Sequence, residues 1–139
     1  MARITVKHCL ICEDSRREPN SKVTLLGFYG VAPDVTILVF AFGRPIPRLE
    51  FFVIGEVDAT GEVPFTPEIR DETGRVIAGF PESAKVPVTA AGEIQLGVVF
   101  QNIVFQEPGT YTFWLGSEGA SVYETVFRLA HPPPGVTPT

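Results

Sequence analysis

Two cysteines stand close enough along the chain for redox or zinc chemistry. Cys9 and Cys12 have the C-x-x-C spacing, but thioredoxin-type reactivity needs such a pair at a helix N-terminus, where the dipole lowers the thiol pKa. This pair follows alternating apolar residues that are typical of a strand. A zinc site would need further ligands, and the chain has only two histidines. We therefore expect structural, reduced thiols, with no metal and no cofactor bound.

The two histidines do not support a catalytic triad. His8 falls with Val6 and Leu10 on the predicted apolar face of the first strand, where we expect a hydrogen-bonded core residue. His131 begins a Pro-rich end of the chain. No Ser-His-Asp or Cys-His arrangement follows from these two positions, which argues against nucleophilic hydrolysis.

The strongest local signal is a charged segment, residues 13–22, with the sequence EDSRREPNSK. Its alternating charges let carboxylates and guanidinium groups pair and order a long loop. A solvated loop is the simpler interpretation, and a binding site is the alternative. The candidate binding residues in this segment are Asp14, Arg16, Arg17, Glu18 and Asn20.

Trp114 and two acidic turns are further candidates for ligand binding. Trp114 lies on the strand face opposite Phe113 and Leu115, and an exposed indole can stack on a sugar or contact a partner protein. Burial beneath a loop is the alternative for this side chain. Turns 58–61 and 71–74 carry carboxylates that can chelate calcium. Their spacing is not that of a calcium loop, and Asp and Gly suit tight turns for conformational reasons alone.

The composition indicates one domain made of many short strands. Of the 139 residues, 45% are hydrophobic, and 13 Gly and 13 Pro are spread between apolar runs. This content of apolar residues is sufficient for one hydrophobic core without disulfides or metal. We expect a single domain over residues 1–130, followed by a Pro-rich flexible tail over residues 131–139.

Hydrophobic alternation predicts most of the strands. Strands with one buried face are expected at residues 4–10, 23–29, 94–105, 110–115 and 123–129, and the last three are expected to form an antiparallel meander. The continuous apolar run 35–42 predicts a central strand that is buried on both faces. A further apolar strand is expected at 49–57, with Glu50 and Glu56 near its ends.

Turn chemistry predicts how these strands connect. We expect hairpins at turns 58–61 and 71–74, and Pro64 and Pro67 predict an edge position for the strand before the second turn. Residues 80–91 are expected to form an irregular crossing with a short helical turn at 82–85. Roughly seven to nine strands without a helix predict an all-β, two-sheet antiparallel β-sandwich of the immunoglobulin-like kind. A closed barrel is the alternative.

Two segments also carry a resemblance to a known family. Residues 12–14, 17–18, 20, 22 and 25–29 resemble the N-terminal portion of a family of small uncharacterised bacterial proteins. Residues 100–105 and 108–113 resemble the C-terminal portion of that family. The resemblance implies a bacterial β-sandwich without assigned catalytic residues. The Pro-Gly-x-Tyr-x-Phe element at 108–113 is also similar to a turn and strand of immunoglobulin-like folds, which concerns topology only.

The charge and the apolar runs restrict the choice of partners. A net charge of −5 opposes binding to a nucleic-acid backbone. The N-terminus does not have the apolar stretch of a secretory signal, and the longest apolar run is too short for a membrane helix. We expect a cytoplasmic, non-enzymatic protein-interaction or structural module that uses a sheet face or edge. The alternatives are a carbohydrate or small-ligand binding sandwich and a calcium-dependent hydrolase.

Overall fold

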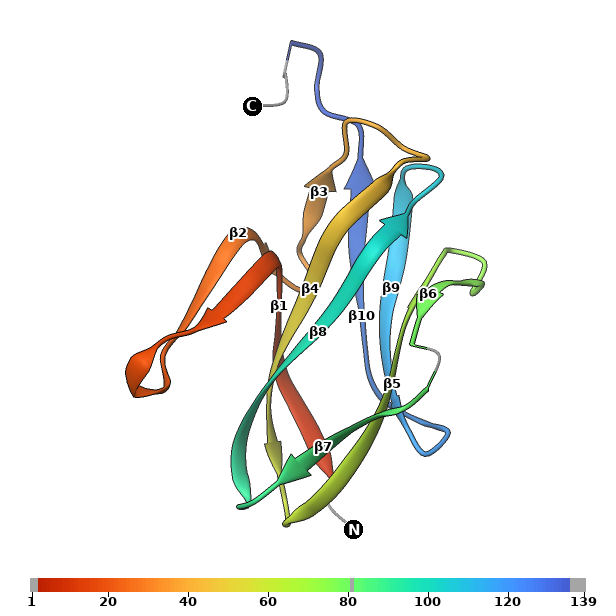
Figure 1. The fold of residues 1–139 in the computed structure, drawn as a ribbon. Coiled ribbons are helices and arrows are strands. Elements are labelled where there is room, and N and C mark those ends of the chain that lie inside the picture. Colours follow the sequence, from red (N-terminus) through yellow and green to blue (C-terminus); the bar gives the residue numbers. More distant parts are fainter. Residues whose placement is uncertain (1–2, 81, 136–139) are drawn as a thin grey trace.

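The chain is an all-β sandwich of two packed sheets. The computed structural model describes residues 3–80 and 82–135, and ten strands in this part form sheets A and B (Figure 1). The predicted two-sheet β-sandwich is confirmed, with ten strands in place of roughly seven to nine. Residues 1–2 and 136–139, which belong to the predicted domain and to the predicted tail, lie outside the described residues.

Sheet A contains the three longest strands of the described chain. Its order is β2-β1-β4-β8, and all neighbours are antiparallel. A short 3-10 turn at Pro19–Ser21 joins the first two strands. The strands of this sheet are β1 (Ile4–Arg17), β2 (Val23–Val31), β4 (Pro45–Val57) and β8 (Gly92–Val104).

Sheet B has the order β3-β10-β9-β5-β6, with β7 paired to β5. The hairpin at turn 71–74 is confirmed, because β5 and β6 pair across it. The chain also forms the predicted hairpin between its last two strands. The strands of this sheet are β3 (Thr36–Leu38), β5 (Gly61–Arg70), β6 (Val76–Gly79), β7 (Ala84–Val88), β9 (Gly109–Ser117) and β10 (Ala120–Ala130).

Aromatic packing holds the two sheets together. Phe51 of β4 stacks on Phe113 of β9, with ring centroids 4.2 Å apart and an interplanar angle of 5°. Phe100 of β8 meets the same two rings edge-on, and Phe127 of β10 tilts against Phe51. All four rings are buried in one apolar core. Offset and edge-to-face pairs of this kind add to the free energy gained from burying apolar area.

Sheet A is covered on its outer side by an extension of its own strands. Pairing between β1 and β4 ends at Cys12 and Glu50, whereas pairing between β1 and β2 continues to Arg17 and Val23. We call this two-stranded extension, residues 13–28, the ribbon (Figure 1). The Arg17 Nη2 donates to the Gln95 carbonyl of β8 at 3.4 Å, which places the ribbon against sheet A.

The prediction of a long charged loop at residues 13–22 is wrong. β1 continues through Arg17 and β2 begins at Val23, so the connection is only a tight turn. Pairing with β2 satisfies the backbone N–H and C=O groups of residues 14–17 that face β2. Its charged side chains stay accessible because a two-stranded extension leaves much of its surface in water.

The expected burial of His8 is also wrong, because β1 contains a bulge. Its register with β4 shifts between Val6 and His8. One extra residue reverses the direction of every following side chain. Cys9 and Ile11 therefore enter the core, and His8 is exposed.

Residues 35–42 form an edge instead of a central strand. Only Thr36–Leu38 is strand, and it pairs in parallel with β10 alone among the described strands. Val35, Ile37 and Val39 are buried, whereas Leu38 and Phe40 are exposed. The exposed face of this edge carries the apolar side chains Leu38 and Phe40. The sequence therefore predicted burial on both faces, although only one face is buried.

Two predicted connections prove to cross between the sheets. Turn 58–61 joins β4 of sheet A to β5 of sheet B instead of closing a hairpin. The expected meander is wrong in its first step, because β8 pairs with β4 while β9 and β10 pair in the other sheet. Alternation shows that a strand has one apolar face. It does not show which of the two sheets the strand joins, because the apolar face is buried in either sheet.

Strand β5 and the segment after it differ from the prediction as well. β5 lies inside sheet B, not at its edge, because it pairs with β9 on one side and with β6 and β7 on the other. Pro64 lies where only β7 pairs and Pro67 where only β9 pairs, so each missing N–H can face an unpaired side. The predicted helical turn at 82–85 is replaced by bends and the start of β7.

Phe51→Ala is expected to destabilise the sandwich by about 3–5 kcal/mol, because it removes the ring at the centre of the aromatic core. The control is Phe28→Ala, which truncates a ring that is 53% exposed and should change stability by about 0.5 kcal/mol or less. Urea unfolding followed by circular dichroism measures both. Equal losses for the two variants would contradict the described core.

Candidate functional site

A buried carboxylate lies on the outer face of sheet A, beneath the ribbon. Glu50 follows Leu49 and precedes Phe51 on β4, so alternation turns its side chain away from the core. It is nevertheless only 1% exposed. The Ser15 Oγ donates to its Oε2 at 2.5 Å, and the Arg48 Nη2 lies 3.4 Å from its Oε1. A buried carboxylate requires such partners, because an unpaired one would be strongly destabilising.

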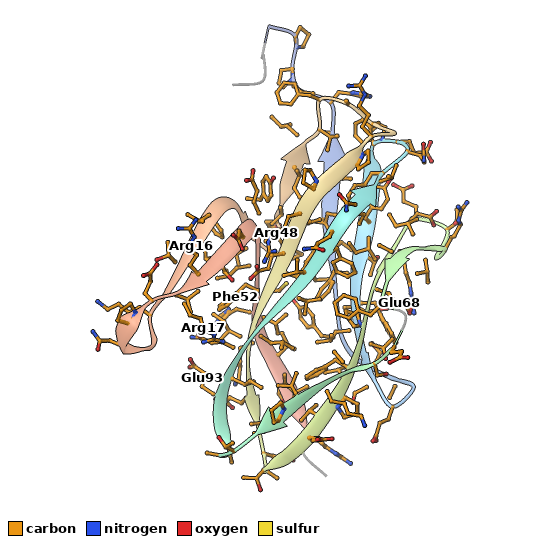
Figure 2. All side chains as sticks on the ribbon, in the orientation of Figure 1. Arg16, Arg17, Arg48, Phe52, Glu68 and Glu93 are labelled. Atoms are coloured by element: carbon orange, nitrogen blue, oxygen red, sulfur yellow. The ribbon has the colours of Figure 1, made fainter. Side chains whose placement is uncertain are left out.

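Arg48 connects this carboxylate to the ribbon. Its Nη2 lies 3.0 Å from the Asp14 Oδ1 in addition to the contact with Glu50. The Arg48 Nε is buried and has no hydrogen-bond partner among the described residues. We call Asp14, Ser15, Arg48 and Glu50 the polar cluster. It holds two carboxylates and one guanidinium group, and Figure 2 shows Arg48 and Phe52 on the side of sheet A toward the ribbon.

A glycine makes room for the buried carboxylate. A Cβ on Gly97 would lie 2.9 Å from the Glu50 Oε2, which is closer than real side chains approach. Gly97 belongs to β8 and pairs with Phe52, two residues along β4 from Glu50. The small residue therefore lets the carboxylate lie flat across the neighbouring strand.

The predicted binding residues of the charged segment lie at different places on the ribbon. Asp14 pairs with Arg48 of β4, and Arg17 donates to a carbonyl of β8. Arg16 is exposed, Glu18 closes the turn through its backbone N–H to the Lys22 carbonyl, and Asn20 occupies the tip with a φ of 68°. The segment therefore divides into a part that contacts sheet A and an exposed tip.

Trp114 lies on the outer face of sheet B, far along the chain from the ribbon. The Arg70 guanidinium carbon lies 4.4 Å from the centroid of its ring, and Arg70 also pairs with Glu68 at 2.9 Å. The indole occupies the space that a side chain at Gly116 would need. Stacking of a sugar on this ring would therefore require Arg70 to move.

The cysteines are buried and their thiols are protonated at neutral pH. Both are free, and neither is exposed. Burial raises the pKa of Cys9 to about 12 and that of Cys12 to about 11. Among the described residues there is no group of three or more His, Cys, Asp or Glu side chains that could hold a metal ion. The described helical turn is not long and apolar enough to cross a membrane.

An open groove lies where the edges of the two sheets face each other. It has a volume of about 530 Å³, and its walls are residues 77–80 of β6 and its C-terminal flank, residues 99–104 of β8, and Arg48. β6 and β8 each end their sheet in the described strand order. Phe80 packs edge-on against Phe100 at 5.6 Å within this lining. A larger hollow of about 640 Å³ near the β9–β10 turn does not have two such walls.

The wall formed by β8 is kinked at one residue. Asn102 has a φ of 52°, in the left-handed region that non-glycine residues rarely adopt. The other two described non-glycine residues with positive φ, Asn20 and Glu118, lie at hairpin turns. Unlike them, Asn102 lies within a strand and lines the groove. Unfavourable backbone conformations of this kind concentrate at functional sites.

Sequence reasoning missed Arg48, Glu50 and the groove. Glu50 stands among Leu49, Phe51, Phe52 and Val53, and a carboxylate inside a continuous apolar run indicates a buried charge with a partner. That signal identifies Glu50 but not its partners, because Ser15 lies 35 residues away in the chain. The groove depends on which strands end the sheets, and this order has no local signal.

Comparison with known proteins supports the fold. The chain is similar to part of the alkylpurine DNA glycosylase AlkC from Pseudomonas fluorescens, solved with DNA containing an abasic-site analogue, with 13% identity and a TM-score of 0.52. The match covers 94% of this chain and 31% of the glycosylase, so this chain spans about a third of that protein. An immunoglobulin-like protein from Pseudomonas aeruginosa aligns over 94% of this chain and 97% of its own length, with 11% identity and a TM-score of 0.41.

The similarity to AlkC concerns the fold alone. No protein-family model and no curated protein matches the sequence. The resemblance of residues 12–29 and 100–113 to small bacterial proteins therefore stays a prediction.

The thiols of the native protein are expected to resist modification. At pH 8 Cys9 and Cys12 should not react with a disulfide reagent such as Ellman's reagent, because burial keeps both pKa values near 11 to 12. Reactivity should appear only as the pH approaches 11. In denaturant at pH 8 both thiols should react at once, which serves as the control. Rapid modification of the native chain at pH 8 would contradict the buried positions.

Asn102→Val is expected to cost about 1–2 kcal/mol, because a β-branched residue strongly disfavours the left-handed region. Asn102→Gly should remain close to the wild type, since glycine adopts this conformation readily. The free energy of unfolding in urea measures both variants. A Val variant as stable as the Gly variant would show that the kink is not a feature of the folded chain.

Proposed function

We propose that the chain is a non-enzymatic interaction module that binds an extended segment of a partner protein in the groove between β6 and β8. The bound segment adds a strand to sheet A along the edge of β8. The observation that carries this proposal is a groove whose two walls are the terminal strands of the two sheets.

The backbone of the groove walls supports this choice of ligand. A strand at the end of a sheet presents a row of N–H and C=O groups without a strand partner. An incoming strand satisfies that row, while the pockets beneath alternate side chains give specificity. At residues 77–80 and 99–104 two such edges face one cavity. A strand paired with β8 would place every second side chain toward Phe80 and Phe100.

The groove also limits which strands can bind. Its lining contains apolar residues and the amides Gln101 and Asn102, and Arg48 is the one charged group among the described lining residues. Asn102 divides the edge of β8 into two short parts, and irregularities of this kind protect sheet edges from indiscriminate pairing. We therefore propose a ligand with apolar residues at alternate positions and a backbone that follows the kink.

A protein partner agrees with the charge of the chain. The net charge of −5 opposes nucleic acid, although AlkC was solved with DNA. We propose a cytoplasmic setting, in which thiols such as Cys9 and Cys12 stay reduced.

Panning a phage-displayed library of random dodecapeptides on the folded chain tests the proposal. Selected peptides should bind the wild type and lose about tenfold or more in affinity to Val99→Asp, which places a charge in the groove. The matched control is Val126→Asp, a similar change at an exposed valine on the outer face of sheet B. Calorimetry measures each dissociation constant. Peptides that bind both variants equally would place the site elsewhere.

Backbone methylation of a selected peptide separates strand addition from simple apolar contact. N-methylation of residues whose N–H faces β8 should abolish binding, whereas methylation of the intervening residues should leave it nearly unchanged. Equal tolerance at both sets of positions would exclude strand addition.

A further inference from the structure

Arg48 belongs to two parts of the molecule that the sequence does not connect. It lines the groove, and it holds the ribbon through Asp14 at 3.0 Å while also contacting Glu50 at 3.4 Å. Both carboxylate contacts use the same nitrogen, Nη2. Any movement of this guanidinium toward the groove therefore alters the docking of the ribbon.

The hydrogen bonding of Arg48 is incomplete. A guanidinium carries five N–H donors in a planar fork. The Arg48 Nε is buried and has no partner among the described residues. A bound strand would bring carbonyl oxygens into the groove, and rotation of the guanidinium toward them would supply the acceptors that are missing.

The two carboxylate contacts of Arg48 differ in how easily they separate. Asp14 and Arg48 are both more than one-third exposed, and exposed ion pairs contribute little to stability. Glu50 is 1% exposed and keeps its hydrogen bond from Ser15. Water can replace Arg48 at Asp14 but not at Glu50. The contact with Asp14 is therefore the one that yields.

We propose that Arg48 couples the groove to the ribbon, so that a strand bound in the groove draws Arg48 away from Asp14 and loosens the ribbon. The coupling is reciprocal, because two events that compete for one group affect each other equally. Docking of the ribbon opposes groove binding, and release of the ribbon promotes it. This inference rests on the proposed function and adds a form of regulation to it.

Affinity measurements test the coupling with a peptide selected on the wild-type groove. The Asp14→Asn change weakens the contact between Asp14 and Arg48 that competes with the peptide. The Asp14→Asn variant should therefore bind the peptide about five-fold more tightly than the wild type. In the Arg48→Lys background the same Asp14→Asn change should have no effect, because lysine has no counterpart of the Nε–H donor that is available to a bound strand. An affinity gain that persists in the Arg48→Lys background, or no gain in the wild-type background, would overturn the proposal.

Amide hydrogen exchange gives a second measurement. Saturating peptide should speed exchange at residues 14–17 and 24–26 of the ribbon in the wild type but not in Arg48→Lys. The control Arg44→Lys changes an exposed arginine just before β4 and should respond as the wild type does. Unchanged ribbon exchange in the wild type at saturation would overturn the coupling even if the peptide binds.

The free protein separates failure of the coupling from failure of the proposed function. If library panning yields no peptide for the groove, the proposed function falls and the regulation falls with it. The role of Arg48 in holding the ribbon is then judged alone, by exchange in Arg48→Lys without peptide. Ribbon amides should exchange faster in this variant than in Arg44→Lys, and equal rates would show that Arg48 does not hold the ribbon.

Discussion

The structure depends on β4 being covered on both faces. On one face Phe51 meets Phe113 of the opposite sheet, and on the other face Phe52 and Glu50 are buried although no second sheet lies there. A sandwich of two sheets covers only one face of each. The ribbon contacts this second face of β4, where Ser15 meets Glu50 and Asp14 meets Arg48. The residues by which β1 and β2 extend beyond the sandwich therefore pack against β4.

The polar cluster determines how the ribbon docks. A carboxylate under apolar cover is tolerated only with hydrogen bonds and a compensating charge, and the loss of one partner costs more than the pair contributes. Ser15 from the ribbon and Arg48 from β4 satisfy Glu50 from two directions, and Gly97 leaves the space. Such requirements are directional, whereas apolar contact is not. Glu50 thus favours the position of the ribbon that brings Ser15 to its carboxylate.

The sequence predicts local elements well where one-sided burial is regular. Alternation located β9 and β10 correctly because Phe113, Leu115, Phe127 and Leu129 face the core without interruption. It failed at His8, where a bulge reverses the direction of the side chains, and at Leu38 and Phe40, where apolar residues face water. A segment with a bulge, or with an apolar face toward water, has the same residue types as a regular strand with buried apolar residues. Periodicity alone therefore cannot detect them.

The candidate sites were predicted less well than the strands, for a topological reason. Of the predicted residues, Asp14 takes part in the polar cluster, while Trp114 lies on the other sheet under Arg70. The cluster exists because pairing places Cys12 opposite Glu50, and that register joins residues far apart in the sequence. The groove likewise follows from strand order, since β6 and β8 become neighbours only after the chain has crossed between sheets.

The groove remains open because β6, which borders it opposite β8, is a short strand. β7 pairs with β5 over Gly61 to Phe65. Beyond that point β6 contributes only four residues, too short a strand to cover the edge of β8. A sheet edge left accessible in this way favours unwanted pairing unless it is made irregular. The left-handed Asn102 supplies that irregularity within β8, so the edge is accessible to a strand that matches its kink and resists strands that are straight.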